Sequence, residues 1–466
     1  MSGRTDSGRT GGGWAGTGRV EGGRSEGGIR VAEDLAEDFT ATWAELAPIG
    51  LRADGGYDRF AWTTEDLALR DWFRRAAAAR DLALEEDGNG NLWAFWHGPE
   101  GPGGSRRVVA TGSHLDSVPA GGAFDGPLGV VAGFLALDLL RRDRALPPGR
   151  SVAVACFVEE EGARFGLACL GSRLLTGAVL PADARELADA DGVTLAEAMA
   201  AAGADPSSLG ADEARLAAID AYVELHVEQG RRLVDLGAAV GIATGIWPHG
   251  RWRLRFAGEP NHAGTARLED RRDPMLPFAE AVTAARVAAT AHGGLATVGR
   301  ADVHPNATNG VAASVEAWLD ARAPDDAALG AIVADVRARA GASAADHGVR
   351  IDMRQESATP AVVFDEGLRR RMAGALAPLA PQASHDAPGA PPWGGSVPEI
   401  ATGAGHDAGI LAARVPAGML FVRNPTGISH SPAEAASVSD CVAGVEALAR
   451  VLGELAWGLP TPSPGP

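Results

Sequence analysis

Short apolar segments alternate with helical patterns over most of this chain, and several of them run directly into histidine or acidic residues. Segments 107–112 and 151–158 predict buried strands, and the stretch 129–140 between them predicts a helix that is apolar on more than one side. The same alternation continues with strands at 222–226 and 418–422 and an apolar helix stripe over 442–455. Strands separated by helices favour a mostly parallel sheet with helices on both faces.

Residues 246–356 follow a different order, which is strand, helix, strand, strand, helix, strand. The expected strands are 251–257, 295–303, 314–322 and 349–354, with a helix at 274–291 and a second helix starting at 324–326. This order is typical of a small ferredoxin-like α+β domain. The predicted fold is therefore α/β, with an inserted domain at 246–356 between catalytic parts 36–245 and 357–457. A disordered tail is expected at 1–35 and another tail at 458–466.

Charge and composition exclude several classes of function. The 466 residues carry 60 acidic and 42 basic side chains, and every basic one is arginine. The net charge of −18 argues against nucleic-acid and anionic-membrane partners. Without lysine, a Schiff-base enzyme and a Walker-A loop are excluded. The three cysteines form no CxxC pair, no apolar run has membrane length, and no apolar leader stands at the N-terminus, so we expect a cytoplasmic protein.

The most informative cluster follows the strand at 107–112. His114 offers an imidazole for zinc, manganese or nickel, and Asp116 can accept the other ring N–H and fix the tautomer. Asp125 lies among glycines that allow a tight bend, and a carboxylate can bridge two cations. The alternative interpretation is a turn with a capping aspartate and a hydrogen-bonded histidine.

Acidic and histidine residues also follow the later strands. Glu159, Glu160 and Glu161 end one strand, and sites assemble at such strand ends in parallel sheets; a solvated acidic loop is the alternative. His226 ends another strand, and His430 stands in a loop before the last helix. Counting ligands assigns one ion to His114, Asp125 and His226, and a second to Asp125, Glu160 and His430. Glu159 then remains as the base for metal-assisted hydrolysis of an amide-like C–N bond.

The inserted domain adds three candidates. His262, in a polar turn, is suited to donate to a developing oxyanion, although a surface histidine would look the same. Arg322 can bind a substrate carboxylate, or it can form an ordinary ion pair with Asp320 or Asp325. Asn309 is either a substrate contact or a turn residue.

These motifs resemble those of the dinuclear amidases related to peptidase family M20. The resemblance rests on GSHLDS, GGAFDG, EEEGARFG, ELHVEQG, NHAGT and SHSPAE and spans residues 36 to 457. It is greatest to the branch of allantoate amidohydrolases, N-carbamoyl-L-amino acid hydrolases and β-ureidopropionases. Histidine within ELHVEQG is typical of this ureido-hydrolysing branch, whereas an acidic residue is usual in the peptidases.

The resemblance implies a role for each candidate residue. The implied metal ligands are His114, Asp125, Glu160, His226 and His430, with two divalent ions per subunit, manganese or zinc and alternatively cobalt or nickel. The implied catalytic residues are Glu159 as the base, His262 as the oxyanion donor, and Asp116. The implied substrate contacts are Arg322, Asn309, Gln229 and His249. The inserted domain is implied to be a lid through which a homodimer forms, with His262 reaching the partner's site.

The expected reaction is hydrolysis of the ureido C–N bond of a small carboxylate, with release of ammonia and carbon dioxide. Allantoate is the leading substrate, and an N-carbamoyl-L-amino acid or a β-ureido acid is the alternative. His249 keeps this choice open, because allantoate-specific relatives can carry glutamine at that place. An M20 aminoacylase or dipeptidase and a metal-free binding protein on the same scaffold are the two other classes considered.

Overall fold

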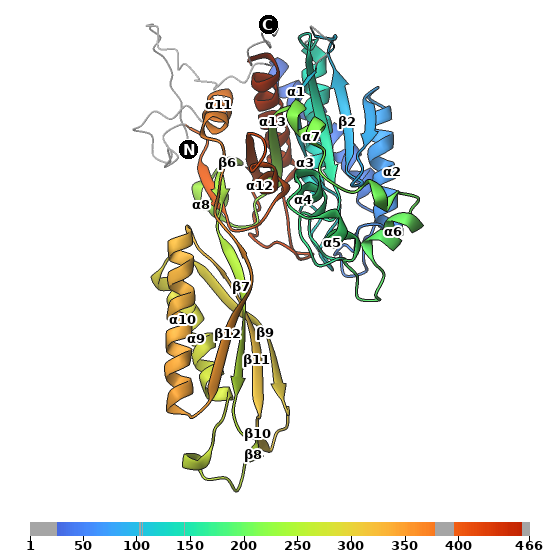
Figure 1. The fold of residues 1–466 in the computed structure, drawn as a ribbon. Helices are drawn as coiled ribbons and strands as arrows, with labels where there is room; N and C mark the ends of the chain where they lie inside the picture. Colours follow the sequence, from blue (N-terminus) through green and yellow to red (C-terminus); the bar gives the residue numbers. More distant parts are fainter. Residues whose placement is uncertain (1–25, 102–103, 105, 144, 378–395, 459–466) are drawn as a thin grey trace, which may run out of the picture.

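The computed structural model describes residues 26–101, 104, 106–143, 145–377 and 396–458 (Figure 1). Most of the predicted tails, at 1–25 and 459–466, lies outside the described residues. Helix α1 (Glu26–Leu46) begins inside the stretch 1–35, which the composition predicts to be a tail. Leu35 and Phe39 of this helix are buried in the main core, so the helix replaces the last part of that predicted tail.

The larger unit is built around a nine-stranded sheet with the order β1-β2-β4-β3-β5-β15-β6-β13, and β14 pairs with β6. Its strands are β1 (Ala83–Glu86), β2 (Leu92–His97), β3 (Arg107–His114), β4 (Arg150–Phe157), β5 (Ile219–Val227), β6 (Val240–Ile246), β13 (Val362–Val363), β14 (Glu399–Thr402) and β15 (Ala417–Val422). The four central strands β4-β3-β5-β15 run parallel, and antiparallel strands flank them. This confirms the predicted α/β class with a mainly parallel sheet.

Both faces of this sheet are apolar and covered by helices. Along β3, Val109 belongs to one core cluster, whereas Val108 and Ala110 belong to the other, as the two-residue period of a strand requires. Besides α1, the helices of this unit are α2 (Thr64–Ala78), α3 (Pro127–Asp143), α4 (Leu170–Thr176), α5 (Pro181–Arg185), α6 (Leu195–Ala201), α7 (Glu213–Ala218), α8 (Arg232–Leu236), α11 (Glu366–Leu376), α12 (Asp407–Leu411) and α13 (Val438–Gly458).

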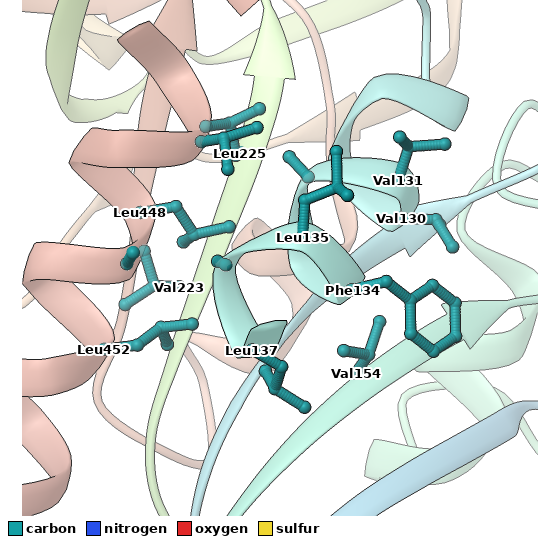
Figure 2. Close-up of a cluster of buried hydrophobic side chains, with 14 of the residues drawn as sticks. Val130, Val131, Phe134, Leu135, Leu137, Val154, Val223, Leu225, Leu448 and Leu452 are labelled. Atoms are coloured by element: carbon teal, nitrogen blue, oxygen red, sulfur yellow. The ribbon is translucent and has the colours of Figure 1, made fainter. Parts of the chain in front are cut away.

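Helix α3 packs directly on the parallel strands. Figure 2 shows Phe134 of α3 beside Val154 of β4, with Leu448 of α13 approaching Leu225 of β5. Because α3 contacts both the sheet and α13, most of its circumference is apolar. This explains a helix without a clear polar face.

A second unit extends from the first and has its own sheet (Figure 1). Its four-stranded antiparallel sheet has the order β12-β7-β11-β9, and helices α9 and α10 cover one face. The elements are β7 (His249–Ala257), α9 (Met275–Ala291), β9 (Leu295–His304), β11 (Ser314–Arg322), α10 (Asp326–Asp346) and β12 (Arg350–Thr359), with a short sheet of β8 (Asn261–His262) and β10 (Gly310–Val311). The observed order of elements is the one expected for the inserted domain, whose exact boundaries and role as a lid stay predictions.

Two smaller findings bear on the sequence-based expectations. Cys156, Cys169 and Cys441 are all buried free thiols, so none of them takes part in a disulfide scaffold. Within the described parts of the chain, no helix combines the length and the apolar character that a membrane crossing needs.

Candidate metal centre at the carboxyl ends of the strands

The candidate site lies where the central parallel strands end. His114 is the last residue of β3, Glu159 to Glu161 follow β4, and His226 lies near the end of β5. His430 belongs to the loop between β15 and α13. Because β4, β3, β5 and β15 are neighbours in the sheet, their carboxyl ends bring residues more than three hundred positions apart to one edge.

Asp125 lies at the centre of this cluster, and its two oxygens face different histidines. Its Oδ1 is 3.7 Å from Nε2 of His114 and 3.2 Å from Nε2 of His226. Its Oδ2 is 3.4 Å from Nε2 of His430, which in turn lies 3.5 Å from an Oε2 of Glu161. Atoms that share one small cation are separated by about 3–4 Å, because metal–ligand bonds are about 2.0–2.2 Å long. One carboxylate therefore belongs to two ligand sets. The first set consists of His114, His226 and Oδ1 of Asp125, and the second of His430, Glu161 and Oδ2 of Asp125.

The donor atoms of the first set are buried and have no hydrogen-bond partner. His114 and His226 are both fully buried, and the Nε2 of each is unpaired. The Nδ1 atoms are occupied, since His114 bonds the carbonyl of Asp116 at 3.0 Å and His226 that of Val227 at 2.9 Å. These bonds place the ring proton on Nδ1 and leave the Nε2 lone pair free. Unpaired buried nitrogens facing a carboxylate fit a divalent metal ion.

The loop that carries Asp125 is held by two local features. Gly126 has a φ of +85°, and a Cβ at this position would lie 2.4 Å from the ring of His114. Only glycine can therefore follow Asp125 in this turn. The carboxylate of Glu434 accepts the backbone N–H groups of Phe124 at 2.8 Å and Asp125 at 3.0 Å. Glu434 thus ties the Asp125 loop to the loop of His430.

The three consecutive glutamates point in different directions. Glu161 reaches His430, as described, and Glu160 places Oε2 3.6 Å from Nε2 of His114. Glu159 instead accepts the backbone N–H groups of Arg164 at 2.9 Å and Phe165 at 2.6 Å, and among the ion pairs of the described residues it makes none with a histidine. The geometry thus brings Glu161, rather than the expected Glu160, to the second ligand set, and it brings Glu160, rather than the expected Glu159, beside the first.

Asp116 holds the glutamate segment rather than the imidazole. Its carboxylate accepts the backbone N–H groups of Glu160 at 3.1 Å and Glu161 at 3.0 Å. The partner of His114 Nδ1 is the backbone carbonyl of Asp116, whereas the carboxylate oxygen expected in that role is 3.5 Å away. Asp116 therefore aligns the two glutamates, and its main chain sets the tautomer.

The electrostatics of the cluster call for positive charge. Burial raises the pKa of Glu160 well above its usual value, and burial together with Asp125 raises the pKa of Glu161 to about 7. Burial alone would also raise the pKa of Asp125, but the adjacent His226, His430 and His114 together outweigh it and bring this pKa well below its usual value. Several buried carboxylates at one point are stable only with compensating charge, which divalent cations supply.

Gln229 lies at the opening of the second ligand set. Its Nε2 donates to Oδ2 of Asp125 at 2.7 Å and is 3.2 Å from Nε2 of His430. The exposed fraction of the His430 side chain is 48%, whereas the histidines of the first set are fully buried. The second set is therefore the solvent-facing side of the centre, where a substrate can approach.

Two predicted substrate contacts lie where the two units join. Arg322 and His249 face each other as register partners of β11 and β7. Arg322 donates from Nη1 to the carbonyl of Gly403 at 2.7 Å and from Nε to Asp320 at 3.1 Å. The predicted ion pair with Asp320 is thus present, and the same guanidinium reaches the loop before His406, whose ring lies 4.5 Å from that of His226.

His262 and Asn309 lie elsewhere. They belong to the β8 and β10 region at the end of the second unit farthest from the larger unit (Figure 1). The backbone N–H of Ala263 donates to the carbonyl of Asn309 at 2.9 Å, so the two residues are held side by side. Within one chain the structure does not bring this pair to the metal centre.

Three contributors were not predicted from the sequence, namely Glu161 as a candidate ligand, Glu434 as the support of Asp125, and Cys169. The thiol of Cys169 lies 3.2 Å from Oε1 of Glu160, and burial raises its pKa well above the usual value, so the neutral thiol is a donor. Glu434 is the last residue of the SHSPAE motif, so the sequence could have indicated that it belongs to the site. Nothing in the sequence links Cys169 to Glu160.

Comparisons with known proteins identify the family of the chain. Residues 110–454 match the model of peptidase family M20/M25/M40. The N-carbamoyl-L-amino acid amidohydrolase of Geobacillus stearothermophilus is 35% identical over 89% of this chain and 97% of that protein. The allantoate amidohydrolase of Escherichia coli is 33% identical over 90% of this chain and 97% of that protein.

A solved structure extends the similarity to three dimensions. The hydantoinase/carbamoylase family amidase of Burkholderia multivorans superposes with a TM-score of 0.78 at 29% identity, covering 90% of this chain and 98% of that chain. The resemblance inferred from the motifs is thereby confirmed. The chain belongs to peptidase family M20/M25/M40, among its hydantoinase/carbamoylase amidases, and is a hydrolase of C–N bonds other than peptide bonds.

Proposed function

We propose that this protein hydrolyses the terminal ureido C–N bond of a small carboxylate and releases ammonia and carbon dioxide, with allantoate as its leading substrate. The observation that carries the proposal is the position of Asp125, whose two oxygens face two separate sets of ligands. Relatives named as allantoate and N-carbamoyl-L-amino acid amidohydrolases support the ureido group as the target.

Two divalent ions fit the ligands. His114, His226 and Oδ1 of Asp125 would hold the first, and Oδ2 of Asp125, Glu161 and His430 would hold the second. A donor set of nitrogen and oxygen suits manganese or zinc, and also cobalt or nickel. When bound, such ions polarise the ureido carbonyl and lower the pKa of water so that a nucleophile forms near neutral pH.

Glu160 is the general base in this proposal. Its Oε2 faces His114 at the first ligand set, while its Oε1 is held by the thiol of Cys169. One oxygen is thus anchored and the other is free to take a proton from the attacking water. The same carboxyl group then passes this proton to the leaving nitrogen. Glu159 shows the same division, because two backbone N–H groups bind its Oε1 while its buried Oε2 has no hydrogen-bond partner. Glu160 is preferred because, among the described residues, it is the one of these two glutamates that lies within ion-pair distance of a histidine of the cluster.

The substrate contacts divide between two copies of the chain. Arg322 would bind the substrate carboxylate, Gln229 would contact the ureido group, and His249 would line the pocket beside Arg322. Burial lowers the pKa of His249, which favours the neutral imidazole in such a pocket. His262 and Asn309 would come from the second copy of a homodimer that forms through the smaller unit, because within their own chain they lie far from the centre.

The experiment is a comparison of substrates. Purified protein loaded with Mn²⁺ is assayed for ammonia release from allantoate and from a panel of N-carbamoyl-L-amino acids. We expect both to be hydrolysed, with a higher kcat/KM for allantoate. Turnover of N-carbamoyl-L-amino acids alone would establish the second candidate function, an N-carbamoyl-L-amino acid hydrolase. The similarity to the Geobacillus stearothermophilus amidohydrolase favours this candidate. Hydrolysis of dipeptides without any ureide would overturn the proposal.

Arg322→Ala is expected to raise KM for these carboxylates by about 10–100-fold, because a charge-assisted hydrogen bond is worth about 1.5–3 kcal/mol. Arg251→Ala is the matched control, since Arg251 pairs with the other oxygen of Asp320 at 3.3 Å and its exposed fraction is 67%. Steady-state kinetics of both variants give the comparison. If Arg322→Ala leaves KM at the level of the control, Arg322 has no place in the substrate pocket.

A further inference from the structure

The turn that carries His262 fixes which ring nitrogen holds the proton. Nδ1 of His262 accepts the backbone N–H of Gly264 at 3.0 Å. A neutral imidazole has one N–H, so a ring that accepts at Nδ1 carries its proton on Nε2. The turn therefore presents His262 to its surroundings as an Nε2–H donor. A donor of this kind is what stabilisation of a developing oxyanion requires.

Arg271 closes this turn from the other side. Its Nη2 donates to the carbonyl of Ala263 at 2.6 Å, and Nε and Nη2 both donate to the carbonyl of Ala266 at 3.1 and 3.0 Å. The backbone N–H of Ala266 donates to the carbonyl of His262 at 3.1 Å. The guanidinium thus ties together the two ends of the segment that follows His262, which is otherwise exposed.

The environment of Arg271 differs from that of its basic neighbours. Arg267 pairs with Asp270 at 2.7 Å, and Arg272 pairs with Glu259 at 3.5 Å. Among the described residues no carboxylate lies within ion-pair distance of Arg271. In the described part of the chain, every side-chain hydrogen bond of Arg271 goes to a backbone carbonyl of the His262 turn. An arginine in this arrangement acts on the shape of the turn, since five fixed donors can hold several carbonyls at once.

We propose that Arg271 is a positioning residue for the hydrolytic reaction. By clamping the carbonyls of Ala263 and Ala266, it keeps the N–H of Gly264 on Nδ1 of His262 and so maintains the Nε2–H tautomer and its direction. Without the clamp the turn relaxes, and the proton is distributed over both ring nitrogens. This inference rests on the proposed function, because it takes His262 to be the oxyanion donor.

The test is a double-mutant cycle in the full-length, metal-loaded protein. Arg271→Ala is expected to lower kcat about tenfold with KM changed by less than about twofold, since a displaced oxyanion donor weakens only the transition state. Arg272→Ala is the matched control and should behave as the unsubstituted protein. His262→Ala is expected to lower kcat about 10²-fold. Adding Arg271→Ala to His262→Ala should cause no further loss.

Each outcome separates the inference from the proposed function. If His262→Ala has normal kcat while ureides are still hydrolysed, the oxyanion role of His262 is wrong and the clamp has no catalytic purpose. If His262→Ala is impaired but Arg271→Ala is not, the positioning role of Arg271 is wrong while the proposed function stands. A full tenfold loss in the double variant beyond His262→Ala alone would show that Arg271 acts independently of His262.

A spectroscopic measurement excludes a purely structural effect. Long-range ¹H–¹⁵N correlation spectra of protein labelled at histidine distinguish a protonated from an unprotonated ring nitrogen, and His262→Ala assigns the signal. We expect an unprotonated Nδ1 and a protonated Nε2 in the unsubstituted protein and in Arg272→Ala, and averaged shifts in Arg271→Ala. Unchanged His262 shifts in Arg271→Ala would overturn the inference. Arg271→Lys, which keeps the charge but has no fork of donors, should retain the Nε2–H tautomer only partly.

Discussion

Glu160→Gln is expected to lower kcat by about 10²–10⁴-fold and to leave the metal content unchanged. The substitution keeps the shape of the side chain and its contact with the thiol of Cys169, but it removes the group that accepts a proton from water. The backbone of Glu160 stays bound to Asp116, so the neighbouring Glu161 keeps its place in the second ligand set. Rates at saturating substrate, together with metal analysis of the same samples, provide the measurement.

The two adjacent glutamates are the controls for this variant. Glu159→Gln can still accept the N–H groups of Arg164 and Phe165, so its kcat is expected to fall less than about tenfold. Glu161→Gln is expected to lose one of the two ions, because Glu161 lies beside His430 in the second set. If Glu159→Gln instead loses most of its rate while Glu160→Gln has a near-normal rate, Glu159 is the base, as ligand counting in the sequence predicts.

The backbone explains why the sequence alone does not give the direction in which each of these glutamates points. In an extended strand, adjacent side chains point in opposite directions, but this alternation can be extrapolated only as far as the strand continues. At Glu159 the chain turns into the left-handed region with a φ of +54°, which a sequence pattern does not reveal for a residue other than glycine. The turn shifts the directions of the following side chains. The sequence therefore places a ligand within this run of glutamates, and the choice between Glu160 and Glu161 stays a prediction.

The convergence of the remaining candidate ligands was predictable because it depends on topology alone. His114 and His226 end strands that are neighbours in a parallel sheet, so their convergence follows from the alternation of strands and helices. The support of Asp125 was not predictable in this way, since Glu434 reaches it from a position 309 residues away in the sequence. Similarly, composition suggested a tail where α1 begins, because scattered apolar residues become a stripe only once a helix forms.

Asp125→Asn is expected to abolish binding of both ions and to lower kcat/KM by about 10⁴-fold or more, the largest effect of any single substitution considered. The reason is geometric, since Oδ1 serves His114 and His226 whereas Oδ2 serves His430 and Glu161. Asparagine keeps the volume and accepts through one oxygen only, and it carries no charge. Metal stoichiometry after gel filtration is the primary measurement.

His430→Ala separates the bridging role of Asp125 from simple ligand loss. Of the two oxygens of Asp125, His430 lies beside Oδ2, which belongs to the second set, so this variant is expected to retain one ion per chain in the buried first set. Asp125→Asn should retain fewer than one, although both variants lose a single side chain from the cluster. If Asp125→Asn instead keeps one ion, as His430→Ala does, Asp125 serves one ligand set and the two sets do not share a carboxylate. If Asp125→Asn retains both ions, Asp125 is not a metal ligand, and the proposed two-ion hydrolytic centre is wrong.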